Sequence, residues 1–225
     1  MIIITGASSG IGQELASLFS KEKDVILISR RDPCLPFAKW IKCDLQDKLQ
    51  ISNLIKTLKG YKKNIELIIH CAGVMKSCSS SSLNIEHCIE SFMVNTIAPL
   101  TITSALTKEI AKCKGKVIVI SSIASKLDIP GEAIYSSTKA ALDKGFELLS
   151  SDLSRLGGTF IKIHPCMIDT PMTSSLTLDQ KNYMHNKRST RNQPTAKELA
   201  EYIFKIKNQP NYITGSSIYF GGIRK

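Results

Sequence analysis

Seven short apolar runs, rich in β-branched residues, recur along this chain of 225 residues, and longer segments with helical periodicity separate them. Strands that alternate with helices pair in parallel, because each crossover helix brings the chain back to the same end of the sheet. Helices then cover both faces of the sheet, which explains why the runs are apolar throughout. We therefore predict an α/β fold built on one parallel sheet, with strands at 1–5, 25–29, 40–44, 65–70, 116–120, 159–165 and 213–222.

One domain, 1–225, accommodates all seven runs, since the chain has the length of a single domain and no composition typical of a linker. The least regular stretch is about 166–194, which is too long for a simple connection between the last two runs. Loops of this kind often close over a ligand, so we predict a mobile lid over the substrate there. Thr195 and Glu198 have capping-box spacing, which predicts that the next helix starts at this point.

The first run is followed at once by GASSGIG and then by a helical pattern. Strand, glycine-rich turn and helix in this order present backbone N–H groups and a helix N-terminus to a phosphate. Gly6 would allow a tight turn, Gly10 a close approach of the backbone to the ligand, and Gly12 close packing of the helix. We predict dinucleotide binding here, while a glycine-rich turn without a ligand stays an alternative.

The second run ends in Ser29, and Arg30 and Arg31 follow it. An acidic residue at this point would accept a hydrogen bond from the adenosine ribose, whereas an arginine can bind a 2′-phosphate. The sequence therefore favours NADP(H) over NAD(H). Two solvated arginines are the alternative, and the nearby Asp32 keeps it open.

A serine, a tyrosine and a lysine follow the fifth run at spacings that suit one reaction. Ser122 falls where the strand ends, and Tyr135 and Lys139 are four residues apart on a helix predicted from about 133 to 149. A nearby cation favours the phenolate, so Lys139 would lower the pKa of Tyr135. Tyr135 could then exchange a proton with a substrate oxygen that Ser122 holds. An isolated pair of this kind is more often a core ring beside a surface charge, so the assignment depends on the rest of the chain.

Asn95 is a further candidate, because it lies in an apolar setting within a long helix predicted from about 86 to 112. A buried amide must find hydrogen-bond partners, which makes this residue structural or functional. His70 and His164 end predicted strands, where we expect histidines with ordinary hydrogen-bond partners rather than general bases.

The composition narrows the class of protein. The seven cysteines form no CxxC pair or metal-type cluster, which favours reduced thiols, no metal and a cytoplasmic location. No apolar run reaches the roughly 18 residues that a membrane span needs, and no signal-peptide pattern is visible. The net charge is +11, but the lysines are scattered and no aromatic residues interleave with them. We expect a small-molecule substrate and no nucleic-acid or membrane partner.

Together, these motifs resemble the short-chain dehydrogenase/reductase family over nearly the whole chain. TGASSGIG at 5–12 is similar to the family's cofactor-binding turn, CDL around Asp44 to its adenine-contacting segment, and HCAG at 70–73 to its NNAG. Asn95 and Ser122 match its asparagine and serine, and YSSTK matches YxxxK, with Tyr135 thirteen positions after Ser122. HPCMIDTPM from position 164 resembles the segment that faces the nicotinamide.

The resemblance implies a single Rossmann domain, a doubly wound sheet of seven parallel strands in the order 3-2-1-4-5-6-7. It implies that Tyr135 is the acid/base, Ser122 orients the carbonyl, Lys139 binds the nicotinamide ribose and lowers the tyrosine pKa, and Asn95 holds a relay water. The cofactor-binding residues it implies are Gly6, Ser8, Ser9, Gly10, Ile11, Gly12, Arg30, Arg31, Asp44, Leu45, Ala72, Gly73, Tyr135, Lys139, Pro165, Ile168 and Thr170.

The C-terminal ITGSSIYFGG resembles the ending of the ketoacyl carrier-protein reductase branch, whose members are often tetramers built partly through the last strand. This implies a homodimer or homotetramer. The departures from the family are His70 and Cys71 in place of two asparagines, and Cys166 in place of a glycine beside the nicotinamide. The function implied is hydride transfer between NADP(H) and a carbonyl or secondary alcohol. The alternative is a non-catalytic NADP-binding sensor or scaffold protein.

Overall fold

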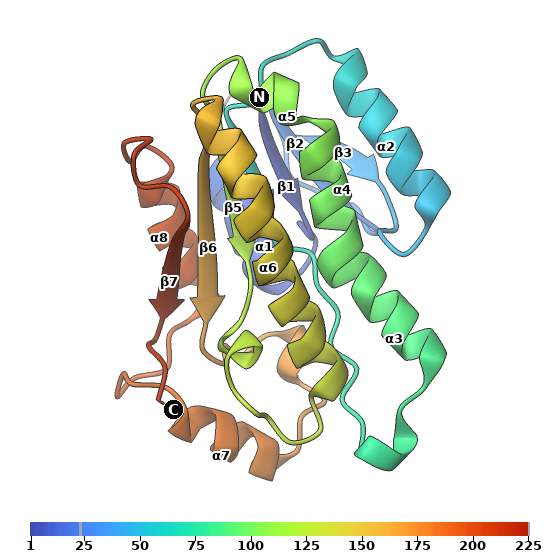
Figure 1. Ribbon diagram of the computed structural model, residues 1–225, viewed down its shortest axis with the longest axis vertical. Helices are drawn as coiled ribbons and strands as arrows, with labels where there is room; N and C mark the ends of the chain where they lie inside the picture. The colour runs from blue at the N-terminus through green and yellow to red at the C-terminus, as the bar shows by residue number, and fades with distance from the viewer. Residues whose placement is uncertain (23, 225) are drawn as a thin grey trace.

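The computed structural model describes residues 1–22 and 24–224, and it confirms the predicted parallel sheet. Seven strands pair in parallel in the order β3-β2-β1-β4-β5-β6-β7 (Figure 1). Most of the strands are buried along their whole length, as the apolar runs predict. Their bounds are β1 Ile2–Thr5, β2 Val25–Ser29, β3 Lys39–Lys42, β4 Leu67–His70, β5 Lys116–Ile120, β6 Thr159–Pro165 and β7 Ser216–Phe220.

The order of the strands reverses between β1 and β4, which pair side by side with Thr5 opposite His70. The crossovers leave β1 and β4 toward opposite sides, so a crevice opens at the carboxyl ends of these two strands. A doubly wound sheet binds its ligand at the carboxyl ends of its strands, in this crevice. In Figure 1 the strand arrows run toward the end of the molecule where α7 lies.

Helices cover both faces of the sheet (Figure 1). One apolar core lies between the sheet and the helices α2, α4 and α6, and the other lies between the sheet and α1 and α8. Alternate residues of β1 feed the two cores, since Ile3 packs in the first and Ile2 and Ile4 in the second. The helices are α1 Gly10–Phe19, α2 Lys48–Gly60, α3 Ile85–Phe92, α4 Ala98–Ala105, α5 Thr107–Ala111, α6 Ala133–Arg155, α7 Leu178–Asn186 and α8 Ala196–Ile206.

Two helical predictions need correction. The single helix predicted from about 86 to 112 is interrupted by a π-helical turn at Met93–Ile97 and again at Leu106, between α4 and α5. The segment 166–194 is more regular than predicted, because it contains α7, which starts with a capping box formed by Thr177 and Gln180. The predicted capping box of Thr195 and Glu198 is confirmed at the start of α8.

In the part of the chain that the structure describes, no helix is both long and apolar enough to cross a membrane. The same residues contain no group of three His, Cys, Asp or Glu side chains placed to hold a metal ion.

Candidate active site

A cleft runs along the carboxyl ends of the central strands, and nearly all of the predicted site residues line it. The turn after β1 forms one wall, and the residues that follow β4, β5 and β6 form the others. Two predicted residues, Arg31 and Asn95, lie outside the described lining. The predicted residues that the structure brings together are Gly6, Ser8, Ser9, Gly10, Ile11, Gly12, Arg30, Asp44, Leu45, Ala72, Gly73, Ser122, Tyr135, Lys139, Pro165, Ile168 and Thr170.

The glycine-rich turn has the geometry of a phosphate cradle. Gly6 has a φ of +74°, and a Cβ there would lie 2.7 Å from the backbone of Ala72. A Cβ on Gly12 would lie 2.0 Å from the carbonyl oxygen of Gly6, so the helix could not pack this close with a larger residue. Ser9 is the N-cap of α1, but its side chain makes no capping hydrogen bond. The N–H groups of the first helical turn therefore face the cleft uncapped, which fits the pyrophosphate of a dinucleotide.

The far end of the cleft is formed by residues that follow β2 and β3. Arg30 and Arg31 are both exposed, and of the two Arg30 lines the cleft. The Ser29 hydroxyl donates to the carbonyl of Arg31 at 2.6 Å and accepts from Trp40 Nε1 at 3.1 Å, so it is already engaged. Asp32 accepts from the backbone N–H of Cys34 at 2.8 Å and closes a local turn. Arg30 is thus the cation that this end of the cleft offers to a ligand.

Three of the four predicted catalytic residues, Ser122, Tyr135 and Lys139, meet at the middle of the cleft. The Ser122 hydroxyl accepts from the backbone N–H of Ala124 at 3.1 Å, which orients it at the end of β5. Tyr135 and Lys139 are both buried on the first turns of α6. Lys139 Nζ donates to the Ile120 carbonyl at 2.9 Å and lies 5.7 Å from the centre of the Tyr135 ring. The β5 end and α6 therefore hold the hydroxyl, phenol and ammonium together.

The pKa of Tyr135 is raised rather than lowered in this site, and the influence of Lys139 on it stays a prediction. Burial raises the pKa of Tyr135 to about 12, and a hydrogen bond with Ser122 opposes the rise only in part. Burial also lowers the pKa of Lys139 to about 8. The physical reason is that both groups lose water in the cleft, and loss of water disfavours the charged form of each.

Asn95 lies behind the cleft, in the π-helical turn. Its side-chain oxygen accepts from the N–H of Val74 at 2.8 Å, and its amide nitrogen donates to the Val74 carbonyl at 2.8 Å and to the Thr138 hydroxyl at 3.0 Å. The prediction that a buried asparagine finds partners is confirmed. Asn95 ties the loop after β4 to α6, and its role with a relay water stays a prediction.

The two departures after β4 are accommodated by new hydrogen bonds. His70 is buried, its Nε2 lies 2.8 Å from the Thr103 hydroxyl, and burial lowers its pKa to about 3. The Thr5 hydroxyl accepts from the N–H groups of Cys71 and Ala72 at 3.2 Å each. A neutral histidine and a threonine therefore steady this end of the sheet, as expected for a histidine with an ordinary partner.

Cys166 fits as a small apolar residue. Its thiol is buried in a hydrophobic cluster and packs against Gly221, where an added Cβ would lie 2.3 Å from the sulfur. Burial raises the pKa of the Cys166 thiol, so the reactive thiolate is disfavoured.

Four methionines line the cleft as well, and one of them, Met75, lies outside every segment that the sequence assigned to the site. Met167, Met172 and Met184 come from the segment predicted as a lid. A side chain on Gly73 would lie 3.4 Å from Met172 Cε and 3.8 Å from Lys139 Nζ, so Met172 reaches the catalytic centre. Met75 and Met167 follow the carboxyl ends of β4 and β6, and this position in the sequence indicates residues that line a ligand site.

Comparisons with known proteins agree with this geometry. Residues 1–181 match the model of the family described as short chain dehydrogenase. The chain is 24% identical to an uncharacterized oxidoreductase of Staphylococcus epidermidis, with 96% of this chain and 94% of the relative covered. It is 28% identical to the 3-oxoacyl-acyl-carrier-protein reductase FabG of Rickettsia prowazekii, with 98% and 94% covered.

Solved structures share the fold. A 4-hydroxyisoleucine dehydrogenase complexed with NADH superposes with a TM-score of 0.89 at 22% identity, covering 98% of this chain and 97% of that one. BdcA in complex with NADPH superposes with a TM-score of 0.85 at 18% identity, covering 100% and 95%. Proteins of this fold thus bind either nicotinamide dinucleotide, and the fold alone does not choose between them.

Proposed function

The chain belongs to the short chain dehydrogenase family and is an oxidoreductase with a nicotinamide cofactor; we propose that the cofactor is NADP(H) and that the reaction interconverts a carbonyl compound and a secondary alcohol. The observation that carries the proposal is the meeting of Ser122, Tyr135 and Lys139 in one cleft, beside the phosphate cradle. A serine hydroxyl, a buried phenol and an ammonium are the groups that proton exchange at a carbonyl oxygen needs.

Each residue has a definite part in this proposal. A bound nicotinamide would supply or accept the hydride. The Ser122 hydroxyl, whose lone pair is held by the Ala124 N–H, donates to the substrate oxygen and orients it. Tyr135 gives its proton to the oxygen as negative charge develops there. Lys139, fixed by the Ile120 carbonyl, places a positive charge beside the phenol and stabilises the phenolate that remains.

The raised pKa of Tyr135 is compatible with a role as proton donor in carbonyl reduction. With a pKa of about 12, the tyrosine is a phenol at neutral pH, and a phenol is the form that donates a proton. Oxidation would need the phenolate, which is scarce under the same conditions.

Arg30 supports the choice of NADP(H). A guanidinium binds a phosphate through paired N–H donors, and Arg30 lines the cleft at the end of β2, which β1 and β4 separate from the catalytic residues after β5. A 2′-phosphate on the adenosine ribose is the anion that would reach it.

The lining of the catalytic end supports an apolar substrate. Among the described residues of the cleft, the charged side chains are Arg30 and Asp44 at one end and Lys139 at the centre. Four methionines are among the remaining lining residues, and their flexible thioether side chains adapt to apolar groups of different shapes. Of the described residues that line this end, Lys139 alone offers a cation to a substrate carboxylate or phosphate, so we propose an apolar ketone or aldehyde. The segment 166–194 would close over it as a lid, since α7 supplies Met184 to the cleft and Tyr183 Oη donates to the Asp128 carbonyl at 2.8 Å.

The test is NADPH oxidation by the purified protein over a panel of carbonyl compounds, with apolar ketones matched to analogues that carry a carboxylate. We expect turnover of apolar compounds, and we expect Tyr135→Phe to lose about 10²- to 10⁴-fold in kcat while it still binds NADPH. Wild-type turnover by Tyr135→Phe would refute the proposed chemistry. Binding of NADPH without turnover across the panel would instead favour the sensor or scaffold alternative.

A further inference from the structure

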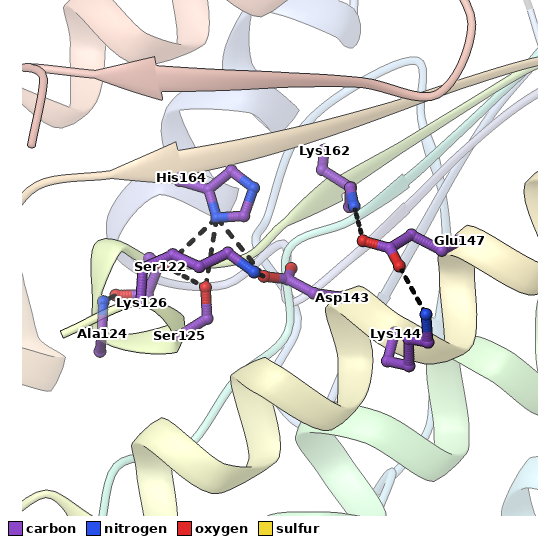
Figure 2. Close-up of polar contacts among 9 residues, drawn as sticks. All are labelled: Ser122, Ala124, Ser125, Lys126, Asp143, Lys144, Glu147, Lys162 and His164. Carbon is purple, nitrogen blue, oxygen red and sulfur yellow. Dashed lines mark hydrogen bonds and ion pairs between the residues drawn. The ribbon is translucent and has the colours of Figure 1, made fainter. Parts of the chain in front are cut away.

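A buried polar cluster lies directly beneath the catalytic serine and takes no part in the chemistry proposed above. Figure 2 shows its members, His164 from β6, Asp143 from α6, and Ser125 and Lys126 from the turn that follows β5. His164 is 0% exposed and Asp143 is 2% exposed. Ionisable side chains this deeply buried need specific partners.

The imidazole of His164 faces the turn that carries Ser122. Its Nδ1 lies 3.3 Å from the Ser122 carbonyl oxygen, 3.4 Å from the Ser125 hydroxyl and 3.7 Å from Asp143 Oδ2 (Figure 2). A carbonyl and a carboxylate can only accept, and the Ser125 hydroxyl gives its own proton to the Ser122 carbonyl at 2.9 Å. A hydrogen bond from the ring to the Ser122 carbonyl or the Ser125 hydroxyl therefore requires that Nδ1 carries the proton, and the more distant Asp143 carboxylate favours the same tautomer.

The other ring nitrogen supports the same tautomer. Among the described residues, Nε2 of His164 has no hydrogen-bond partner. A proton there would be a buried, unsatisfied donor, whereas a lone pair costs less. The ring is held in place by stacking on Tyr219 of β7, with 4.8 Å between the ring centres. His164 is thus a neutral, fixed donor aimed at the Ser122 carbonyl.

Asp143 extends the contact to the catalytic helix. It lies four residues after Lys139 and eight after Tyr135, on the same face of α6. Its Oδ2 pairs with Lys126 Nζ at 3.2 Å, so the far end of the Ser122 turn is tied to α6 (Figure 2). The cluster therefore joins the three segments that must keep their relative positions: the turn after β5, α6, and the end of β6.

We propose that His164 is a positioning residue, which holds the Ser122 carbonyl through Nδ1–H and, with the Asp143–Lys126 ion pair, fixes the Ser122 hydroxyl relative to Tyr135. The proposal rests on the proposed function, because it assigns His164 a role in that reaction. Small misplacements matter here, since a displacement of about 1 Å of a catalytic group can cost about 10²-fold in rate.

Two substitutions of similar size separate this role from simple packing. His164→Asn places an amide N–H near the position of Nδ1, whereas His164→Gln places it near the position of Nε2. We expect His164→Gln to lose about 10- to 100-fold in kcat with little change in the KM for NADPH, and His164→Asn to keep most of the activity. Circular dichroism and thermal unfolding of each variant establish that it is folded.

A matched control comes from the neighbouring ion pair in Figure 2. Glu147 is one turn beyond Asp143 on α6 and pairs with Lys162 of β6 at 2.9 Å, but it does not reach the Ser122 turn. Glu147→Gln should leave kcat within about twofold of the wild type. Lys126→Gln removes the half-exposed partner of the ion pair with Asp143, and it should lower kcat without unfolding the protein. This variant tests the proposal if both His164 variants fold poorly.

The tautomer of His164 tests the inference without a substrate. In ¹⁵N-histidine-labelled protein at neutral pH, the resonances missing from His164→Asn identify His164, and we expect a protonated Nδ1 and an unprotonated Nε2. The opposite tautomer overturns the proposal, and so do equal kcat values for the Asn and Gln variants. If the wild type reduces no carbonyl compound, the proposed function fails, while the tautomer still decides whether His164 holds the Ser122 turn.

Discussion

Two adjacent arginines follow β2, and their different positions make a sharp test of cofactor choice at the scale of single residues. Arg30 lines the cleft and Arg31 does not, although both are exposed and carry the same charge. We expect Arg30→Ala to weaken NADPH binding about 10- to 100-fold, since a charge-assisted contact contributes about 1.5–3 kcal/mol, and to leave NADH binding nearly unchanged. Arg31→Ala is the matched control. Equal losses for the two cofactors, measured by fluorescence titration, would remove the 2′-phosphate assignment.

The pKa of Lys139 makes a second prediction at this scale, on the pH dependence of reduction. An ammonium is charged below its pKa, so the charge of Lys139 is present at neutral pH and is lost as pH rises through about 8. Tyr135 stays protonated over the same range, because its pKa is about 12. We therefore expect kcat/KM for carbonyl reduction to fall as pH rises above about 8.

Lys139→Arg separates this effect from general alkaline inactivation. A guanidinium keeps its charge across the range, so in the variant the fall in kcat/KM should begin at a higher pH, even if the overall rate is lower. A fall that begins at the same pH in Lys139→Arg would assign the titration to another group.

Among the helices and strands, those that depend on a few consecutive residues could be predicted from the sequence, whereas those that depend on contacts across the fold could not. β1, the glycine-rich turn and α1 follow from residue patterns a few positions long, and so do the strand ends that hold Ser122 and Arg30. The π-helical turn around Asn95 could not be predicted, because it depends on what Val74 and Thr138 offer across the fold. The raised pKa of Tyr135 was missed for a related reason, because it follows from burial in a cleft that distant segments form.

Segment 166–194 shows the same limit. Its polar sequence has little amphipathic pattern, yet α7 forms there because Thr177 and Gln180 cap it and Met184 packs in the cluster around Tyr135. Packing of one residue on a distant core is not visible in local periodicity.

One element carries a buried charge that the proposed reaction does not use. Lys116 opens β5, is buried, and donates to the carbonyls of Ile206, Lys207 and Gln209 at 3.0, 2.9 and 2.9 Å. It therefore caps the C-terminus of α8 from the neighbouring strand. Lys116→Met leaves these carbonyls without their donor, and we expect it to lower the free energy of unfolding by about 2–3 kcal/mol. Lys205→Met, at an exposed position of α8, is the control in the same urea titration, and equal effects would contradict the capping role.

In the molecule as a whole, the apolar cores and the cleft occupy different parts of the sheet. Both cores pack on the middle of the sheet, and the residues of the cleft that are assigned to binding or catalysis lie at the carboxyl ends of its strands. The cleft is built from chain segments that are far apart in sequence, so its precision depends on cross-links such as those from Asn95 and His164.

Exposed apolar side chains on the outer surfaces of α3 and α6 suggest a site of self-association. Ile85 and Ile89 are 69% and 57% exposed on one face of α3, and Leu148 is 66% exposed on the neighbouring α6. Large apolar side chains exposed along one face of a helix, as Ile85 and Ile89 are on α3, are typical of a surface that another protein covers. We propose that a second copy of this chain covers it, in a homodimer or homotetramer, because a two-fold axis at such a face pairs like with like.

Ile89→Glu places a charge in the middle of that face, and we expect it to convert the assembly to a smaller species in size-exclusion chromatography with light scattering. Leu49→Glu is the control, since Leu49 is also 69% exposed but lies on α2, away from α3 and α6. A stable dimer buries about 1,200–2,000 Å², so one central charge should raise its dissociation constant by at least about 10-fold. A monomeric wild type would refute the proposed association. Equal behaviour of the two variants would place the interface elsewhere, and the outer edge of β7 would be the next surface to test.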